Sequence, residues 1–353
     1  MQGEKAEMIL QVGPYPEPIG GISIYIKRMK KLMDLLGISN EVWDLSEEKK
    51  EDIGVAQTRL RYVPFKLLFR RDINLIHYNI PGINHKLYIG LFNKLFFKRR
   101  IKLLSIHGDS KNLFITPLIV KALNSFDVII CVKSGDKEYL REKGIRIPVY
   151  EVPPFIFPAQ ENESTTIPSY ILDFIKNKDF IICGNASSMQ FYEGEDLYGI
   201  DMSIELIERL KINGENAGIV FLLPQINNAE YFNKLKSMIA DKKLENDFLF
   251  INENMELYPI IKRSHLFIRP TNTDGYGVSI AEAIYAKVPS IASDVCVRPE
   301  GTILFKSRDI DDLYNKTSEV IENYKQFKER LKDIDFENNG IRLVELYEEL
   351  LSS

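Results

Sequence analysis

The chain has 353 residues, of which 45% are hydrophobic and 27% charged, and its net charge is -4 at pH 7. This composition is typical of a globular protein long enough for two domains, and it excludes a generally basic nucleic-acid-binding protein. No apolar run reaches about 18 residues, so we expect no transmembrane helix or signal peptide, and we predict a cytoplasmic protein.

The first half of the chain alternates short apolar runs with helical patterns. A helix is predicted at residues 22–37, and strands are predicted at residues 8–13, 74–80, 101–107 and 127–132. Continuous apolar runs of this length are typical of a parallel sheet covered on both faces. We therefore predict a doubly wound, Rossmann-like α/β domain over residues 1–157.

A proline-rich and then polar stretch, "VPPFIFPAQENESTTIP", interrupts this alternation. Prolines exclude a helix interior or a central strand, so we predict an interdomain linker at residues 158–168. The alternation then resumes and predicts a second doubly wound α/β domain over residues 169–335. The last residues, 336–353, predict an amphipathic helix.

Two glycines follow the first predicted strand, in "VGPYPEPIGGISIYIKRM". Gly20 and Gly21 open a helix, where free N–H groups and the positive end of the helix dipole suit a phosphate. A simple glycine-aided turn explains the same residues equally well. The pattern is neither a dinucleotide-binding fingerprint nor a P-loop.

The stretch "RPTNTDGYGVSIAEAIYAKVPSIAS" places two acids around a glycine loop. Asp274 precedes Gly275 and Gly277, and Glu282 lies two turns into the following helix. A carboxylate accepts two hydrogen bonds in one plane, which suits the vicinal hydroxyls of a sugar or ribose. On spacing alone, a loop or cap role for Asp274 and a solvated position for Glu282 are also open.

This stretch resembles the acid-x7-acid motif of the retaining GT-B glycosyltransferases, the "group 1" family. The first acid is Asp274 instead of Glu, and Tyr276 stands at the aromatic position. The matching positions are Pro270, Gly275, Gly277, Glu282, Ala283, Ala286, Pro289, Ile291, Ala292 and Ser293. Gly20-Gly21, His107 in "SIHGD" and the last helix also resemble that family.

The resemblance implies a GT-B fold, with two domains facing a deep cleft and the C-terminal helix crossing back to the first domain. The first domain would bind the acceptor and the second a nucleotide-sugar donor. No cofactor or metal would be required. The donor would be a UDP- or GDP-sugar, and the acceptor a polysaccharide or a lipid-linked oligosaccharide.

The resemblance also assigns roles to individual residues. Glu282 would bind the donor ribose, and Asp274 would bind hydroxyls of the transferred sugar. The backbone of residues 275–278, up to Val278, would serve sugar and phosphate, and Gly20-Gly21 would approach the diphosphate. His107 would lie near the reacting sugar, although a structural strand-end histidine is the alternative.

The chain departs from the family at the cations that neutralise the leaving diphosphate. Asn185 stands where the family has Arg, and Tyr198 stands where it has Lys. Charge on a leaving group must still be offset in a partly dry site. We therefore predict that one or both of Arg269 and Arg298, placed at predicted strand ends, bind the donor in their stead.

No metal site is predicted. Asp309/Asp311 and Asp333/Asp335 form D-x-D strings in charged, helix-like surroundings, and we interpret them as solvated caps. Cys131, Cys183 and Cys296 are widely spaced in apolar runs, which predicts small buried side chains without disulfides. His77, His85 and His265 are expected to be structural or solvated.

The charge differs between the two halves. Residues 1–151 carry 25 basic and 17 acidic side chains, and the remainder carries 21 and 33. Two stretches, Arg59–Arg71 and Lys94–Lys102, mix cations with Phe, Leu and Tyr, which suits the anionic inner face of the cytoplasmic membrane. The alternative is that the apolar residues are core. No motif for nucleic-acid binding accompanies them.

Three functional hypotheses remain open from the sequence. The leading one is a retaining glycosyltransferase. The Asn185 and Tyr198 departures keep open a nucleotide-sugar-binding protein without transferase activity. A GT-B epimerase or phosphorylase is the third, although no motif for a phosphorylase's cofactor lysine is present.

Overall fold

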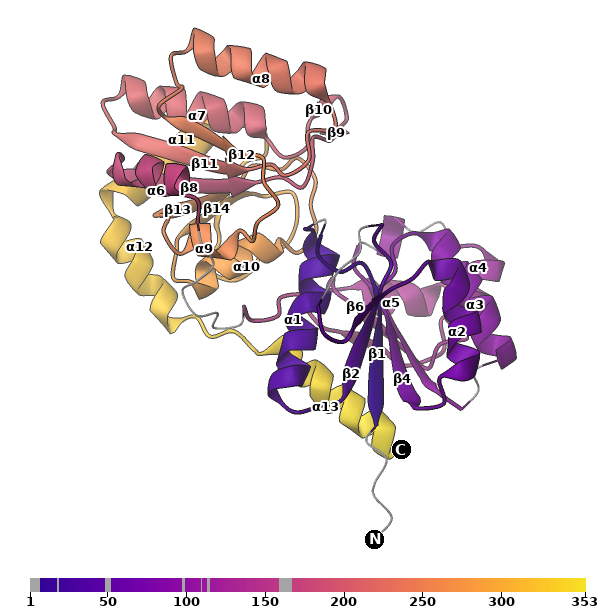
Figure 1. The fold of residues 1–353 in the computed structure, drawn as a ribbon. Coiled ribbons are helices and arrows are strands. Elements are labelled where there is room, and N and C mark those ends of the chain that lie inside the picture. The colour runs from indigo at the N-terminus through magenta and orange to yellow at the C-terminus, as the bar shows by residue number, and fades with distance from the viewer. Residues whose placement is uncertain are drawn as a thin grey trace. The chain divides into compact units, whose positions relative to one another are not determined.

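The computed structural model describes residues 7–17, 19–47, 52–96, 99–108, 110–112, 115–158 and 167–353. The chain divides into two compact units, shown in Figure 1. Unit 1 comprises Met1–Ala159 with Asn338–Ser353, and unit 2 comprises Gln160–Glu337. The division falls inside the expected linker, most of which lies outside the described residues. Both units are layered α/β structures, as predicted.

Unit 1 is built on a seven-stranded parallel sheet in the order β3-β2-β1-β4-β5-β6-β7. Its strands are β1 Met8–Gly13, β2 Asn40–Asp44, β3 Val55–Gln57, β4 Ile73–Tyr78, β5 Ile101–Ile106, β6 Val128–Cys131 and β7 Val149–Glu151. The central strands are apolar throughout because helices cover both faces of the sheet.

The helices of unit 1 form one layer on each face of its sheet (Figure 1). They are α1 Gly21–Leu35, α2 Val63–Phe69, α3 Ile83–Phe96, α4 Pro117–Leu123, α5 Asp136–Glu142 and α13 Asn339–Ser352. The α2–α5 layer packs on Leu10 and Tyr78, and the α1/α13 layer packs on Ile9. The predicted return of the C-terminal helix to the first domain is therefore confirmed.

The return helix is fixed by buried polar contacts as well as by apolar packing. Tyr347 of α13 is fully buried, and its hydroxyl lies 2.5 Å from His77 Nδ1. The other ring nitrogen of His77 lies 2.7 Å from Ser105 Oγ. His77 therefore has a structural role, as predicted.

Unit 2 is built on a six-stranded parallel sheet in the order β12-β11-β8-β13-β14-β15, with a separate β9–β10 hairpin. Its strands are β8 Phe180–Asn185, β9 Phe191–Tyr192, β10 Glu195–Asp196, β11 Ala217–Leu222, β12 Phe248–Ile251, β13 Leu266–Arg269, β14 Ser290–Ser293 and β15 Ile303–Phe305. The apolar runs of the sequence predict five of these strands: β8, β11, β12, β13 and β14.

Helices again cover both faces of the sheet of unit 2. They are α6 Ser169–Lys176, α7 Ile200–Ile212, α8 Ala229–Asp241, α9 Tyr258–Ile261, α10 Val278–Tyr285, α11 Ile310–Glu322 and α12 Tyr324–Arg330. The stretch "MELYPIIKR" at residues 255–263 predicts a longer helix than α9, which starts at Tyr258 because Pro259 has no N–H and favours the first turn of a helix. Within the described ranges, no helix is both long and apolar enough to cross a membrane.

Each sheet has one point where the strand order reverses. In unit 1 the chain leaves β1 toward β2 and later resumes at β4 on the other side, so the reversal lies between β1 and β4. In unit 2 it lies between β8 and β13. Ligands of open α/β sheets bind outside the carboxyl ends of the strands at such a point.

Candidate functional site

The acid loop, residues 270–277, joins β13 to α10 at the reversal point of unit 2. Gly277 ends it in a left-handed conformation with φ 78°, and a Cβ there would lie 2.8 Å from Ile280 Cδ1. The fold itself therefore requires Gly277. A Cβ on Gly275 would meet nothing within 4 Å, so Gly275 leaves its backbone open to a ligand.

Asp274 lies in this loop between two arginine side chains. Arg269 donates from Nε and Nη2 to its carboxylate at 2.5 and 3.0 Å, and Arg298 donates from Nη1 at 2.7 Å. The Asp274 side chain is only 11% exposed. Burial raises the pKa of Asp274, but Arg269 and then Arg298 outweigh burial and hold the pKa well below its usual range. Asp274 is therefore a carboxylate. We call these three residues the Asp274 cluster.

The two arginines of the cluster have different surroundings. Arg298 also donates to the hydroxyls of Thr271 and Ser293 at 3.0 Å each and to the Ser293 carbonyl at 3.0 Å, and its side chain is 2% exposed. Arg269 is 13% exposed, and its guanidinium lies 5.7 Å from the centre of the Tyr198 ring. Arg269 ends β13 as predicted, whereas Arg298 lies in the loop after β14.

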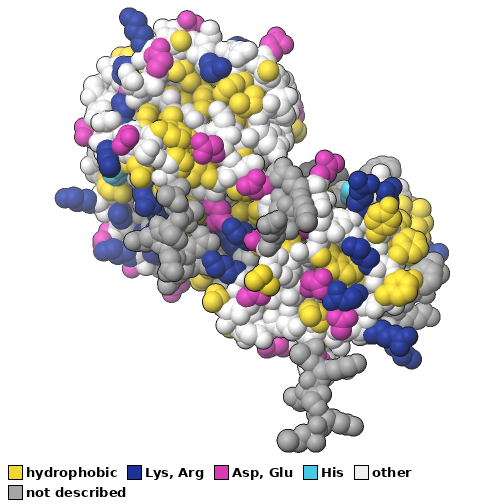
Figure 2. Space-filling view, viewed as in Figure 1, with side chains coloured by type: hydrophobic (Ala, Val, Ile, Leu, Met, Phe, Trp, Pro, Cys, Tyr) yellow, Lys and Arg dark blue, Asp and Glu magenta, His cyan; other side chains and the backbone are white. Residues whose placement is uncertain are grey.

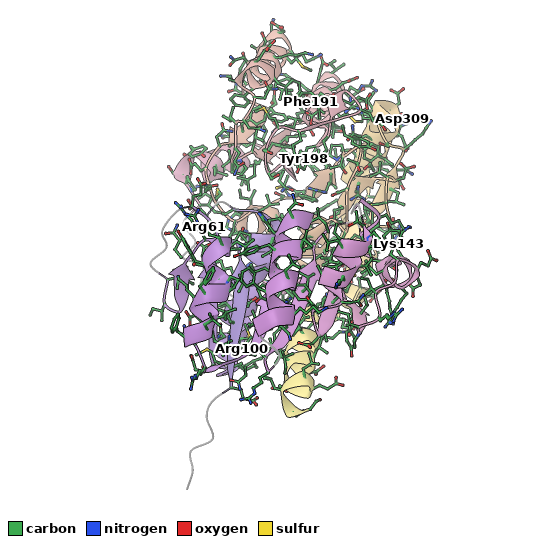
Figure 3. The ribbon with its side chains drawn as sticks, turned by 90° about the vertical axis from the view of Figure 1, so that its right-hand side faces the viewer. Arg61, Arg100, Lys143, Phe191, Tyr198 and Asp309 are labelled. Atoms are coloured by element: carbon green, nitrogen blue, oxygen red, sulfur yellow. The ribbon has the colours of Figure 1, made fainter. Side chains whose placement is uncertain are left out.

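The family's two cation positions are neutral and lie at the same edge. Asn185 ends β8, next to β13, and its Oδ1 is buried without a hydrogen-bond partner in the described part of the chain. Tyr198, labelled in Figure 3, has its hydroxyl 2.9 Å from Ser187 Oγ. The ring of Tyr198 thus lies under Arg269 where the family has a lysine. Positive charge at this edge comes from the Asp274 cluster.

Glu282 lies in the second turn of α10 and is 5% exposed. Burial raises the pKa of Cys183 in β8 to about 12, and the carboxylate of Glu282 contributes to that rise. The burial of Glu282 shows that the solvated-acid alternative is wrong. Tyr276 is half-buried in the acid loop, and burial raises the pKa of its hydroxyl to about 12.

The glycines of unit 1 lie at the start of α1. Gly20 is the N-cap residue with φ -158°, an extended conformation that any residue adopts. The Ser23 hydroxyl accepts from Gly20 N at 2.9 Å and donates to Gly20 O at 3.0 Å. A Cβ on Gly21 would meet nothing within 4 Å. Packing within the described residues therefore does not require either glycine.

His107 directly follows β5, near the reversal point of unit 1. Its Nε2 lies 2.8 Å from Asn79 Oδ1, and its ring packs edge-on to Tyr25 at 4.9 Å. Burial, and then the charge of Lys86, lower the pKa of His107 to about 3. His107 is therefore a neutral hydrogen-bonding group at neutral pH and not a proton carrier.

Sequence reasoning missed several residues that the fold brings to these two edges. Asn79 follows β4 directly, and its Nδ2 is buried without a partner within the described ranges. Thr271 and Ser293 both bind Arg298. A polar residue at the end of each apolar run, as in "HYNIP", is the pattern that identifies them in the sequence.

One cysteine differs from the expectation. Cys131 and Cys183 are buried, but Cys296 is half-buried, and its Sγ lies 2.9 Å from the carbonyl oxygen of Gly275. The prediction that Cys296 is a small core side chain is therefore wrong, because the loop after β14 turns it toward the acid loop.

The described residues contain no group of three His, Cys, Asp or Glu side chains that could hold a metal ion. Asp309 accepts from Asp312 N at 3.0 Å and caps α11, in agreement with its interpretation as a cap. The cations of this site are thus guanidinium groups.

Comparisons with known proteins identify this architecture. The model of the family "Glycosyl transferases group 1" matches residues 193–335, which include the whole acid loop. No curated protein matches the chain.

Among solved structures, a glycosyltransferase from Rickettsia africae has a TM-score of 0.75 at 15% identity, with 98% of each chain covered. Anabaena Alr3699/HepE in complex with UDP has a TM-score of 0.66 at 15% identity, covering 98% of this chain and 100% of that one. A sucrose-phosphate synthase from Thermosynechococcus elongatus has a TM-score of 0.69 at 14% identity, with 98% and 99% covered.

The structural likenesses establish the GT-B fold over nearly the whole chain, and the family model covers the acid motif itself. Residues 193–335 therefore match the group 1 glycosyltransferase family, and the chain has the GT-B fold.

Proposed function

We propose that this enzyme transfers a sugar, with retained anomeric configuration, from a UDP- or GDP-sugar to a polysaccharide or lipid-linked acceptor. The observation that carries the proposal is the ionised Asp274 beside an open glycine loop at the reversal point of unit 2. The Anabaena structure similar to this chain is a complex with UDP, which supports a nucleotide-sugar donor.

In this proposal each predicted residue has a role at one of the two edges. Asp274 accepts from hydroxyls of the transferred sugar, and the buried Glu282 accepts from the ribose. Gly275, Tyr276 and the backbone up to Val278 hold sugar and phosphate. The proposed diphosphate-binding residues are Gly20, Gly21, Asn185, Arg269 and Arg298.

The remaining roles follow from the charges at the edges. His107, neutral and held by Asn79, donates or accepts a hydrogen bond at the reacting sugar. The guanidinium groups offset the diphosphate charge, so the reaction requires no metal. A cleft between the two domains, with unit 1 binding the acceptor, stays a prediction.

Cys296 provides a direct test of donor binding. It is half-buried beside Gly275, whereas Cys131 and Cys183 are buried. Iodoacetamide is therefore expected to modify Cys296 first in the folded protein. Saturating UDP or GDP, bound on the acid loop, is expected to slow this modification at least fivefold, as followed by peptide mass spectrometry.

The outcomes separate the alternatives. If neither UDP nor GDP slows the modification of Cys296, the proposal is refuted. Protection without sugar transfer or donor hydrolysis would favour a nucleotide-sugar-binding protein. Conversion of the donor's sugar without any acceptor would favour an epimerase.

A second proposal concerns where the enzyme works, at the inner face of the cytoplasmic membrane. Residues around α2 and α3 expose large apolar side chains, and Figure 2 shows hydrophobic side chains next to Lys and Arg over this part of unit 1. The exposed apolar side chains are Tyr62, Phe65, Leu68, Phe69 and Leu91. The exposed cations are Arg59, Arg61, Lys66, Arg71, Lys94 and Arg99. We call these residues the basic surface.

Not every cation of the predicted stretches belongs to the basic surface. Arg70 pairs with Glu41 and Asp72, and Arg100 donates to the carbonyls of Leu67 and Arg70. Lys102 is buried against Asp127. Each exposed cation contributes about 1 kcal/mol near an anionic membrane, and the exposed rings insert at the headgroup level.

Vesicle co-sedimentation tests the basic surface. We expect binding to vesicles with 30% phosphatidylglycerol and little binding to pure phosphatidylcholine. The double variant Phe65→Ser/Phe69→Ser is expected to reduce the bound fraction at least fivefold. Leu35→Ser/Ile212→Ser, at two other exposed positions, serves as the control. Equal recovery with both vesicle types would count against the proposal.

A further inference from the structure

The two arginines of the Asp274 cluster are bound to the protein to different extents. Arg298 makes four hydrogen bonds, to Asp274, Thr271 and Ser293, and is almost fully buried. Arg269 hydrogen-bonds the Asp274 carboxylate alone, and its Nη1 has no hydrogen-bond partner in the described part of the chain. Arg269 is also the more exposed of the two.

Asp274 keeps most of its hydrogen bonds when Arg269 is removed. Its Oδ2 still accepts from Arg298 Nη1 at 2.7 Å and from Thr271 Oγ1 at 3.3 Å. Its Oδ1 still accepts from Gly275 N at 2.9 Å. Removing Arg298 instead would leave two hydroxyls and a backbone carbonyl without their shared donor, so the cost of moving Arg298 is much higher.

Release of Arg269 also changes what Asp274 offers to a ligand. Arg269 Nη2 occupies Oδ1 at 3.0 Å, the carboxylate oxygen that Arg298 does not touch. Once Arg269 leaves, Oδ1 has one backbone donor and a vacant acceptor position. A sugar hydroxyl can then take the place of the guanidinium.

A diphosphate is a suitable new partner for Arg269. Arginine forms bidentate hydrogen bonds to phosphate as it does to carboxylate, and a diphosphate carries more negative charge than one carboxylate. Asn185 and Tyr198 provide no competing cation at this edge. The face of the Tyr198 ring, 5.7 Å away, supports the guanidinium and leaves its edge open to the new partner.

We propose that Arg269 is an exchangeable cation that moves from Asp274 to the diphosphate of the donor, whereas Arg298 is a positioning residue that stays on Asp274. This inference rests on the proposed function. Diphosphate binding thereby opens Asp274 to the sugar, so that recognition of the two parts of the donor is coupled. In the free enzyme Arg269 blocks Asp274 against sugars that lack a nucleotide.

Isothermal titration calorimetry with UDP and GDP tests the exchange, and the tighter nucleotide is used throughout. Arg269→Gln is expected to weaken that nucleotide at least tenfold and to leave its nucleoside, which lacks phosphate, unchanged. Asp274→Asn releases Arg269 and is expected to tighten the nucleoside diphosphate at least threefold. In the Arg269→Gln background the same Asp274→Asn change is expected to have less than half of this effect.

Two further variants distinguish the exchange of Arg269 from a general effect of losing an arginine. Arg209→Gln, which removes an arginine paired with Glu205 and Asp311 elsewhere in unit 2, is expected to leave nucleotide affinity unchanged. Arg269→Lys keeps the charge and is expected to retain an intermediate affinity, which serves as the readout if Asp274→Asn fails to fold. If the wild-type enzyme binds neither nucleotide, the proposed function fails. If it binds one and Arg269→Gln leaves that affinity unchanged, only the exchange is overturned.

Discussion

The reversal points of the two sheets have equivalent places in the fold and different chemistry. In unit 1 the edge carries Asn79 and the neutral His107, and the charge of Lys86 acts on His107. In unit 2 the edge carries the Asp274 cluster, with two guanidinium groups and one carboxylate. Neutral hydrogen-bonding groups suit a polyhydroxyl ligand, and a pair of guanidinium groups suits a diphosphate.

This local pattern does not follow the overall charge. Residues 1–151 have an excess of basic side chains and the remainder has an excess of acids. Among the described residues of unit 1, exposed cations lie around α2 and α3 and also around α4 and α5, while the acid-rich unit 2 keeps two arginines at its reversal point. The charge of a domain therefore does not predict the charge of its site.

The largest expected effect comes from neutralising the carboxylate of Asp274 in unit 2. Asp274→Asn leaves two buried guanidinium groups without their anion, which is expected to destabilise unit 2 by about 3 kcal/mol and to lower sugar transfer at least a thousandfold. Hydrogen exchange of β13 and a transfer assay measure the two effects. Asp311→Asn, at an exposed ion pair with Arg209, is the control and is expected to change stability by less than about 0.5 kcal/mol. If Asp274→Asn keeps near wild-type sugar transfer, the charged edge of unit 2 does not have the role that distinguishes it from the edge of unit 1.

The glycines of the two edges are expected to respond with opposite signs. Gly277→Ala forces a side chain into a left-handed conformation and against Ile280, which is expected to cost about 1–2 kcal/mol of stability. Gly21→Ala meets open space at the first position of α1 and is expected to be neutral or slightly stabilising.

Function distinguishes the glycines further. If Gly21 serves a ligand, Gly21→Ala lowers nucleotide-sugar turnover about tenfold in a fully stable protein. Thermal unfolding and turnover, measured on both variants, give the comparison. Wild-type turnover in Gly21→Ala would leave Gly20-Gly21 as the simple turn that the sequence also allows.

The sequence predicts most of the fold because the central strands are apolar on both faces. The apolar runs that form β1, β4, β5, β8 and β11 are buried only in a parallel sheet that helices cover on both faces. Strands β2, β3 and β15 are short or partly polar, so their pairing depends on neighbours that a local pattern does not reveal.

The sequence predicts the residues of the site but not their contacts. The spacing indicates that Asp274 and Glu282 lie around a glycine loop, and the need to offset the diphosphate charge indicates Arg269 and Arg298. The ion pairs of Asp274 with both arginines were not predicted, because the 24-residue separation of Asp274 and Arg298 is closed only by the β13–β14 pairing. The neutral state of His107 depends on burial, which the strand-end position alone does not fix.

The smallest expected effect is the dependence of stability on pH, which differs between the two units. His77 is fully buried, and burial lowers its pKa to about 3. Below the ordinary pKa of about 6.5, the unfolded chain therefore binds a proton that the folded chain does not, so stability is lost as pH falls. We expect unit 1 to lose about 1 kcal/mol through His77 between pH 7.0 and 5.5.

Trp43, the only tryptophan of the chain, lies buried in β2 and reports the unfolding of unit 1 by fluorescence in urea. His77→Gln is expected to be less stable at pH 7 but to lose less stability on acidification than the wild-type protein. The Asp274 cluster shows the opposite behaviour, because a lowered carboxylate pKa maintains its contribution at every pH above about 4. Hydrogen exchange of β13, corrected for the intrinsic exchange rate, is thus expected to report the same Asp274 contribution at pH 7.0 and 5.5. Equal acid sensitivity of the wild type and His77→Gln, measured at Trp43, would show that His77 takes up its proton in the folded state, in conflict with its buried contacts to Tyr347 and Ser105.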